Sequence, residues 1–140
     1  MINLRRAPIY DALLFYALRR DLETHRFLPR FGEALSLENH MAWFAARVWT
    51  AAWYVAEQGG QSVGVVRLDG EPDRSVSIIV APNVRGRGIG LEMLRQLAAI
   101  ECGPFYASIH QLNAPSIRVF ERAGYVRVGS NGVWLLYRRD

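Results

Sequence analysis

One stretch of the chain, residues 75–100, constrains its fold and function more than any other. It reads SVSIIVAPNVRGRGIGLEMLRQLAAI: a β-branched strand pattern, three glycines at alternate positions, then an amphipathic helix pattern. A strand, glycine loop and helix in this order bring backbone N–H groups and the positive end of the helix to one point. That point suits a phosphate-bearing ligand, and Arg85 and Arg87 add positive charge there. The plainer alternative is a glycine turn that binds nothing.

Two familiar phosphate loops do not match this stretch. The dinucleotide pattern G-x-G-x-x-G requires a third glycine at position 91, where Leu91 stands. A Walker loop requires a lysine after its last glycine, and the chain contains no lysine at all. Because lysine is absent, Schiff-base and pyridoxal chemistry are excluded as well.

Length and composition indicate a single globular domain. With 140 residues and a hydrophobic fraction of 51%, the chain has room for one core, so we expect one domain over residues 1–140. Its uncharged apolar stretches are far shorter than the ~20 residues of a membrane span, and the N-terminus lacks a signal-peptide pattern. We therefore expect a cytoplasmic protein with no membrane partner. The single Cys102 provides neither an internal disulfide nor a metal cluster, so we expect no metal.

The charge of the chain suggests one further class, the nucleic-acid-binding proteins. The formal net charge is +4, and all 17 basic residues are arginine. The arginines are spread along the chain, a distribution more typical of solvated faces and of a pocket for a small anionic ligand. We therefore expect no nucleic-acid partner.

Hydrophobic periodicity predicts the order of the secondary-structure elements. Strands are expected at residues 2–6, 52–57, 62–69, 75–80, 105–109, 125–128 and 133–138, and helices at 8–20, 36–48, 88–100 and from a cap at 113–116 to about 123. The third helix is expected to bury Ile89, Met93, Leu94, Leu97 and Ile100. Residues 129–132 are interpreted as the turn of a closing hairpin, and Gly64 as a close approach or bulge. This order predicts an α+β fold with a central mixed, mostly antiparallel sheet and helices on both faces.

Two motifs make the chain resemble a known family. The loop Arg85-Gly86-x-Gly88-x-Gly90, after a strand that ends in V-x-P, looks like the pyrophosphate loop of the GNAT superfamily of acyl-CoA-dependent N-acyltransferases. A second stretch, NAPSIRVFERAGY at residues 113–125, looks like the C-terminal helix motif of the same family. The predicted element order also resembles the GNAT fold, so the resemblance covers nearly the whole chain.

The resemblance implies acetyl-CoA as co-substrate and a set of residues that bind it. In this family the central strand separates from its neighbour beside the pantetheine arm, the loop holds the pyrophosphate, and the last helix lies near the sulfur. The implied cofactor-binding residues are Ile78, Ile79, Val80, Arg85, Gly86, Arg87, Gly88, Ile89, Gly90, Leu91, Asn113, Ser116 and Phe120. For Asn113, a role as helix cap is an alternative that is compatible with cofactor binding.

The sequence departs from common family patterns at the positions of the catalytic groups. Phe120 stands where a tyrosine often protonates the leaving thiolate, and phenylalanine cannot do so. Ser108 matches the position of a glutamate base in relatives of the ribosomal alanine type, which weakens a protein N-terminus as acceptor. The remaining candidates are Ser77, which could position a water molecule, and His40. For both, a purely structural role is the alternative.

The acceptor is expected to be the primary amine of a small molecule. The pattern E-x-H-x-x-W-F at residues 38–44 resembles the N-terminal helix of bacterial enzymes that acetylate nucleotide-linked amino sugars. In that case Arg26 or Arg30 would meet the nucleotide phosphates. Two alternatives stay open: acetylation of a protein amine, and a non-catalytic acyl-CoA-binding regulatory module. The family resemblance also leaves a homodimer open.

Overall fold

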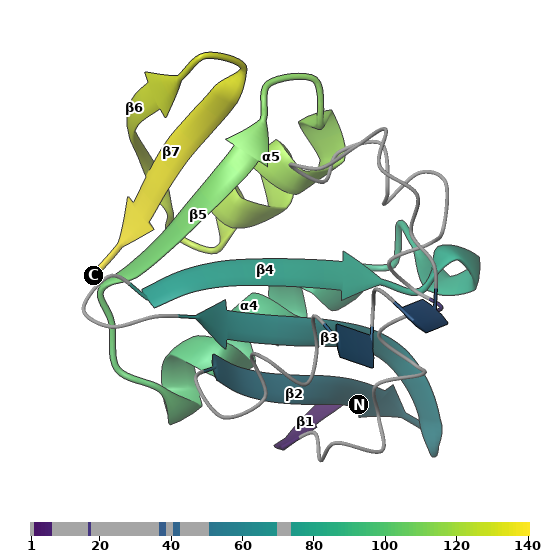
Figure 1. Cartoon of the computed structure of the whole chain (residues 1–140). Helices are drawn as coiled ribbons and strands as arrows, with labels where there is room; N and C mark the ends of the chain where they lie inside the picture. Colours follow the sequence, from purple (N-terminus) through teal and green to yellow (C-terminus); the bar gives the residue numbers. More distant parts are fainter. Residues whose placement is uncertain (1, 7–16, 18–36, 39–40, 43–50, 70–73) are drawn as a thin grey trace.

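The computed structural model describes residues 2–6, 17, 37–38, 41–42, 51–69 and 74–140, which form a seven-stranded sheet with two α-helices packed on it (Figure 1). The elements are β1 (Ile2–Arg6), β2 (Ala51–Gln58), β3 (Gln61–Asp69), β4 (Arg74–Val80), the 3-10 turn η2 (Pro82–Val84), α4 (Ile89–Ile100), β5 (Phe105–His110), α5 (Ala114–Arg122), β6 (Val126–Asn131) and β7 (Trp134–Arg139). The predicted strands are thus all present, with ends shifted by at most one residue except at β6, which ends three residues later than expected. The helices expected at 8–20 and 36–48 lie almost wholly outside the described residues.

The sheet is mixed and mostly antiparallel, as expected. Its strands follow the order β1-β2-β3-β4-β5-β7-β6, and only the β4–β5 pair is parallel. The outer edge of β1 is bonded by a side chain from α4: the amide of Gln96 accepts from Leu4 N–H at 3.0 Å and donates to the Ile2 carbonyl at 2.6 Å. An amide side chain thereby satisfies backbone groups that an edge strand would otherwise expose.

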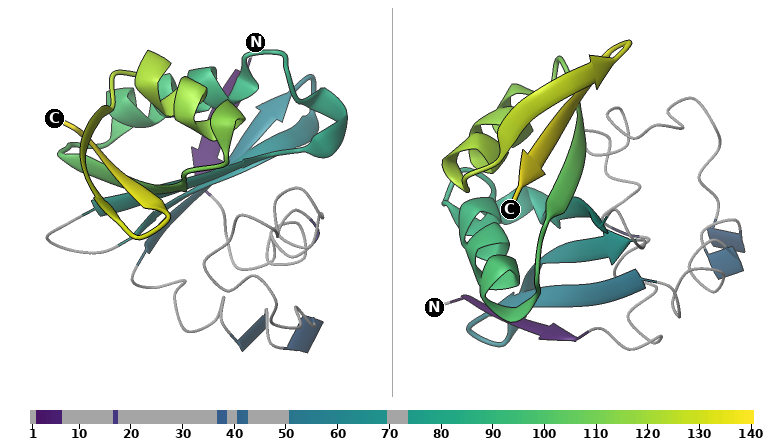
Figure 2. Two further views of the ribbon diagram at one scale, coloured as in Figure 1. Left: turned by 90° about the horizontal axis from the view of Figure 1, so that it is seen from above. Right: turned by 90° about the vertical axis from the view of Figure 1, so that its left-hand side faces the viewer.

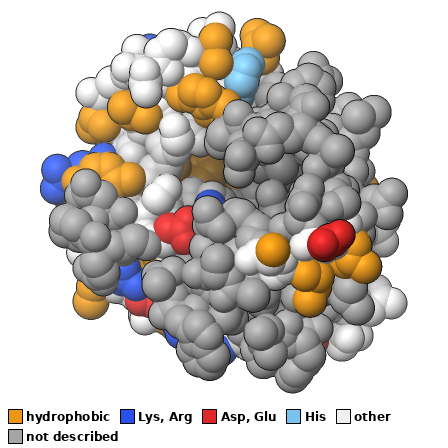
Figure 3. Space-filling view, viewed as in Figure 1, with side chains coloured by type: hydrophobic (Ala, Val, Ile, Leu, Met, Phe, Trp, Pro, Cys, Tyr) orange, Lys and Arg blue, Asp and Glu red, His pale blue; other side chains and the backbone are white. Residues whose placement is uncertain are grey.

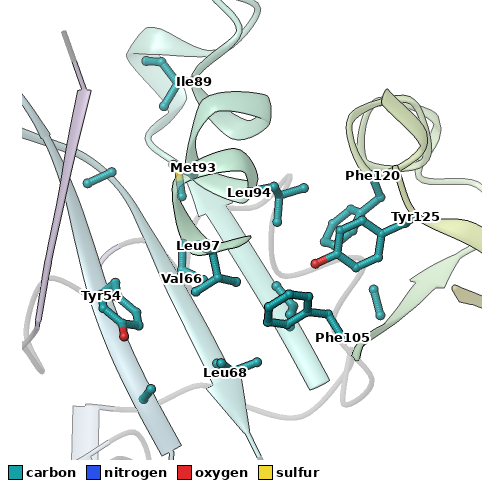
Figure 4. Close-up of a cluster of buried hydrophobic side chains, with 14 of the residues drawn as sticks. Tyr54, Val66, Leu68, Ile89, Met93, Leu94, Leu97, Phe105, Phe120 and Tyr125 are labelled. Carbon is teal, nitrogen blue, oxygen red and sulfur yellow. The ribbon is translucent and has the colours of Figure 1, made fainter. Parts of the chain in front are cut away.

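Both described helices cover the same face of the sheet (Figure 2). Side chains of α4 such as Met93, Leu94 and Leu97 point into a core shared with the sheet and with α5 (Figure 4). The expectation that Ile100 belongs to this buried set is wrong, because its side chain is 53% exposed. Ile100 is the last residue of α4, so no following turn covers it. The other two predicted helices fall almost wholly on residues that the structure does not describe.

The closing hairpin turns later than predicted. The turn lies at Gly132 and Val133, where Gly132 has φ +61°, and not over residues 129–132. Gly129 is a strand residue beside a register shift in the β6–β7 pairing, which falls between Arg127 and Gly129. A bulge and a turn both favour glycine, so the sequence marked both positions without separating them.

The helices of the described part give no sign of a membrane segment. Neither combines the length and the apolar character that crossing a bilayer requires.

Candidate functional site

The parallel pair at the centre of the sheet opens into a wedge. Strands β4 and β5 are paired only at Arg74 with Phe105 and at Ser75 with Tyr106. Beyond Ser75 they diverge, and Figure 1 shows the gap widening toward the C-terminal ends of both strands. The strand separation implied by the family resemblance is therefore present. We call the point where pairing ends, at Ser75 and Tyr106, the vertex of the wedge.

The backbone of β4 supplies polar groups to this wedge. The N–H of Ala81 donates to the Val63 carbonyl of β3 at 2.8 Å, so the backbone groups of Ala81 point toward β3. Successive residues of a strand direct their N–H and C=O to opposite sides. The backbone groups of Ile78 and Val80 consequently point away from β3, into the wedge. Ile79, by the same alternation, directs its backbone groups toward β3 and not into the wedge. A role of Ile78, Ile79 and Val80 in binding the pantetheine arm stays a prediction.

The three loop glycines are required for two different reasons. Gly86 and Gly88 have φ of +78° and +79°, and an added Cβ would meet no atom within 4 Å at either position. Backbone conformation alone therefore calls for glycine there. At Gly90, a Cβ would lie 3.4 Å from atoms of both Ile78 and Val119. Gly90 thus lets the first turn of α4 pack tightly between β4 and α5.

The start of α4 presents open backbone donors. Its first backbone hydrogen bond runs from Glu92 N–H to the Gly88 carbonyl at 3.2 Å, and no described side chain caps this end. The N–H groups of Ile89, Gly90 and Leu91 precede that bond and have no carbonyl one turn earlier. Together with the positive end of the helix dipole, they form a site suited to an anionic ligand.

The two loop arginines differ in their surroundings. Both are exposed, but the Arg85 Nε donates to the Val80 carbonyl at 3.1 Å, which folds its side chain back onto the end of β4. Arg85 thereby helps to fix the loop on the strand, whereas Arg87 extends from the loop itself. Their contact with pyrophosphate stays a prediction.

The residues predicted on α5 occupy two environments. The Asn113 side chain caps the helix by accepting from Ser116 N–H at 3.4 Å, so the capping role is present. Phe120 is buried, with its ring 4.9 Å from the ring of Tyr125 in an edge-to-face contact (Figure 4). Burial raises the pKa of Tyr125 to about 12, so this phenol stays neutral at physiological pH. The placement of Phe120 near the sulfur stays a prediction.

The face of the sheet opposite the helices carries polar groups next to the wedge. Ser77 is exposed on this face and lies across from Arg67 on β3, while Ser75 lies across from Asp69. Arg67 and Asp69 form an ion pair, with 2.8 Å between Nε and Oδ2. Asp69 is not among the site residues that the sequence predicts. The alternation of β3 was the available signal, since it puts residues 67 and 69 on one face.

A cavity of about 320 Å³ lies at the vertex. Its lining includes Ser75, Tyr106 and Ser108, together with Val128 and Leu136 from the closing hairpin. Figure 3, which views the side of the sheet opposite the helices, shows a hollow with hydrophobic atoms on its floor. Ser108, noted in the sequence as the replacement of a family glutamate, therefore lies at the edge of a cavity that the sequence did not reveal.

His110, at the end of β5, is the histidine that the structure describes. His110 makes an edge-to-face contact with Trp134 at 5.2 Å, and its Nδ1 accepts from Leu112 N–H at 3.1 Å, which indicates a structural role. His40 lies outside the described residues, as do Arg26 and Arg30. Among the residues that are described, no three His, Cys, Asp or Glu side chains gather in a way that could hold a metal ion.

Solved structures share this fold over nearly the whole chain. A domain from Methanocaldococcus jannaschii superposes with a TM-score of 0.85 at 21% identity, covering 99% of this chain and 97% of that one. An aminoglycoside acetyltransferase in complex with coenzyme A superposes with a TM-score of 0.81 at 16% identity, and the match covers 99% of this chain and 95% of that one. A ribosomal-protein-alanine N-acetyltransferase from Brucella melitensis gives 0.77 at 26% identity, covering 98% of each chain. No curated protein sequence matches the chain.

The sequence itself matches a family model. The model describes the GNAT acetyltransferase domain, and it covers residues 2–126, which contain the wedge, the glycine loop and all of α5. The expectations of the GNAT fold and of an N-acetyltransferase are thereby confirmed. The chain belongs to the GNAT family of acetyltransferases.

Proposed function

We propose that this enzyme transfers the acetyl group of acetyl-CoA to the primary amine of a small molecule. The observation that carries the proposal is the wedge, in which backbone groups of β4 that have no partner strand lead directly to the open N–H groups at the start of α4. Acetyl-CoA has matching parts, because its amide-containing arm ends in a pyrophosphate.

The donor would bind mainly through backbone groups. Its pyrophosphate would accept from the N–H groups of residues 89–91, where the helix dipole favours negative charge. Its amides would pair with Ile78 and Val80 in the manner of a strand added to an exposed sheet edge. The residues that line this path are partly apolar, since Ile78, Val80 and Val119 pack against the core from its edge. These features fit a long, mostly neutral arm with a charged end.

Catalysis would rest on positioning and on backbone polarity. Acetyl-CoA supplies an activated thioester whose carbonyl carbon an amine can attack. The chain holds the two reactants in contact and directs β4 N–H groups at the developing oxyanion. Ser77, exposed beside the wedge, would orient a water molecule that takes the proton of the amine. With phenylalanine at position 120 the thiolate leaves unaided, which a thiol pKa of about 8.5 permits.

Similar solved structures are named for several different acceptors. They include an aminoglycoside acetyltransferase, a ribosomal-protein-alanine N-acetyltransferase and a putative phosphinothricin N-acetyltransferase. For this chain we favour a small amine, and a nucleotide-linked amino sugar belongs among the candidates because of the pattern at residues 38–44. Most of that pattern lies outside the described residues, so the acceptor has to be found by experiment.

The test combines binding with turnover. Calorimetry measures acetyl-CoA affinity with CoA as competitor, and release of free thiol is followed with kanamycin, phosphinothricin, a nucleotide-linked amino sugar and a peptide with N-terminal alanine. Binding together with thiol release on a small amine supports the proposal. Thiol release on the peptide alone would assign a protein acceptor instead. Binding without turnover on any amine would favour a regulatory acyl-CoA-binding module, and absence of binding would refute the donor site.

A further inference from the structure

We propose that the acceptor is an amphipathic amine, whose compact apolar group fills the vertex cavity while its ammonium group faces Asp69. This inference rests on the proposed function and deepens it, because it specifies the chemical class of the acceptor. It follows from the position of the cavity, from the character of its lining and from the register of β3 with β4.

The cavity lies where an acceptor would have to bind. With the pyrophosphate at residues 86–91, the donor arm runs back along β4 from Val80 toward Ile78, so its reacting end points to the vertex. The cavity includes Ser75 and Tyr106, the last residue pair before the strands diverge. A molecule held there meets the thioester from the side opposite the glycine loop.

The lining of the cavity favours an apolar group. Tyr106, Val128 and Leu136 are among the residues that line it, and none of the described lining residues is charged. Val128 and Leu136 are 58% and 36% exposed, so covering them with an apolar ligand removes hydrophobic surface from water. A cavity of about 150 Å³ in another protein accommodates benzene. The present volume of about 320 Å³ therefore has room for a phenyl ring or a branched alkyl group.

Asp69 lies on the same face, one strand from the cavity. It is the cross-strand partner of Ser75, which lines the cavity, and directly opposite Cα atoms of antiparallel strands are ~5 Å apart. Its side chain is 29% exposed, and its ion pair with Arg67 uses Oδ2. The second carboxylate oxygen, Oδ1, can accept a hydrogen bond from an ammonium group. An amine that reaches from the cavity to Asp69 would place its nitrogen beside the vertex.

The lining also argues against a polycationic acceptor. Each additional ammonium group of an aminoglycoside would need its own carboxylate or hydrogen-bond acceptor. The described lining offers the hydroxyl groups of Ser75, Ser108, Tyr106 and Tyr137 and no carboxylate. The Tyr137 hydroxyl already donates to Glu121 at 3.1 Å. The inference thus separates a mono-amine with an apolar body from a sugar with several amines.

The experiment compares 2-phenylethylamine with ethanolamine and kanamycin. Thiol release gives kcat/KM for each, and calorimetry on the CoA-saturated protein gives amine affinity without requiring turnover. We expect kcat/KM for 2-phenylethylamine to exceed that for ethanolamine about 100-fold, the scale on which apolar pockets discriminate. Equal values, a preference for kanamycin, or no binding of 2-phenylethylamine to the CoA-saturated protein would overturn the inference. In the first two cases the proposed function survives, because acetyl transfer is still observed.

Two matched variants test whether the preference for 2-phenylethylamine depends on the cavity. Leu136→Asp places a charge in the cavity, whereas Val133→Asp alters an exposed apolar residue in the β6–β7 turn, outside the lining. We expect Leu136→Asp to lower kcat/KM for 2-phenylethylamine at least tenfold while Val133→Asp leaves it unchanged, and neither to change acetyl-CoA affinity. A Leu136→Asp variant that converts a dimer to a monomer, with amine selectivity intact, would assign this face to self-association and overturn the inference.

A second pair of variants tests the two parts of the ligand separately. Ser108→Phe fills the cavity without adding charge, so it should weaken the binding of 2-phenylethylamine. The binding of methylamine should not change, because methylamine has no apolar group to place in the cavity. Asp69→Asn removes the charge next to Ser75 and should raise KM for both amines about tenfold, with little change in acetyl-CoA affinity. If Ser108→Phe weakens the binding of both amines equally, the cavity does not hold the apolar group.

Discussion

The two ends of the wedge are built on different principles. At the loop end, one continuous stretch from Ile78 to Leu91 provides a strand edge, positive-φ glycines and open helix N–H groups, all of them backbone features. At the vertex end, side chains from β3, β4, β5 and the closing hairpin are brought together by strand pairing alone. The loop end is therefore local in the sequence, and the vertex end is not.

This difference predicts two kinds of response to mutation. A site made of backbone groups depends on conformation, so a substitution harms it when it forbids a φ value or fills a close contact. A site made of side chains depends on their chemistry, so substitutions there should alter acceptor selectivity and leave donor affinity unchanged. The predictions below test this division, from the largest expected effect to the smallest.

Gly88→Asp should produce the largest change in acetyl-CoA binding. The change puts a side chain at φ +79° and a negative charge beside the proposed pyrophosphate site. We expect acetyl-CoA affinity to fall at least about 100-fold, measured by calorimetry. Gly60→Asp is the matched control, because Gly60 has φ +80° in the β2–β3 turn and its Cβ would also meet no atom. Unchanged affinity in a folded Gly88→Asp protein would refute the loop assignment.

Gly64→Ala should reduce stability and disturb the loop end indirectly. An added Cβ would lie 2.8 Å from the Ile79 carbonyl oxygen and 2.9 Å from the Met93 sulfur, so β3 and β4 would have to separate and the Met93 side chain would have to move. We expect the free energy of unfolding to fall by about 1–3 kcal/mol in denaturant titration, with weaker acetyl-CoA binding. Gly129→Ala serves as control, since its nearest neighbour would be 4.0 Å away. Equal stability of both variants would contradict the close approach.

Glu101→Gln should affect stability and spare the donor site. Burial by itself would raise the pKa of Glu101, but hydrogen bonds from Tyr54 at 2.5 Å and Arg74 at 2.9 Å hold that pKa below its ordinary value of 4.5. We expect the variant to lose about 1–3 kcal/mol of unfolding free energy at neutral pH. Acetyl-CoA affinity should stay unchanged, because Glu101 follows α4 at the end remote from the loop.

The pH dependence of this loss has a defined sign. A carboxyl whose folded pKa is depressed stabilises the protein above its unfolded pKa, and the contribution disappears as the pH falls through the folded pKa. The difference between wild type and Glu101→Gln should therefore be constant above about pH 5 and shrink below pH 4.5. A difference that persists undiminished at the acid end would mean that the charge of Glu101 does not contribute.

Phe120→Tyr should have the smallest effect on folding. Phe120 is 3% exposed and belongs to the buried core, and we expect an added hydroxyl to reach the wedge, where it would stay hydrated. We expect thermal unfolding to shift by only a few degrees, corresponding to about 1 kcal/mol or less, and thiol release to accelerate because the phenol can protonate the leaving thiolate. Tyr125→Phe removes a buried phenol and should not change the rate. A large loss of stability in Phe120→Tyr would show that the ring does not border the wedge.

The sequence predicted much of the fold because its signals are local. The β-branched run, the alternate glycines and the Asn113 cap each act within a few residues, so strand, loop and helix could be read directly. The errors also have local causes. Glycine favours turns and bulges alike, so the turn of the final hairpin was predicted too early. Helical spacing alone does not show that α4 ends at Ile100, where the side chain becomes exposed.

What the sequence determined by itself is the donor end of the protein. Residues 78–91 specify strand, loop and helix start through backbone preferences that need no distant partner. Only the tertiary structure decided the vertex cavity and the approach of Asp69 to Ser75, because both depend on strand register between segments far apart in the chain. A shift of one residue in that register would turn Asp69 to the opposite face. The physical reason for the division is that backbone conformation is set locally, whereas side-chain clusters are set by pairing.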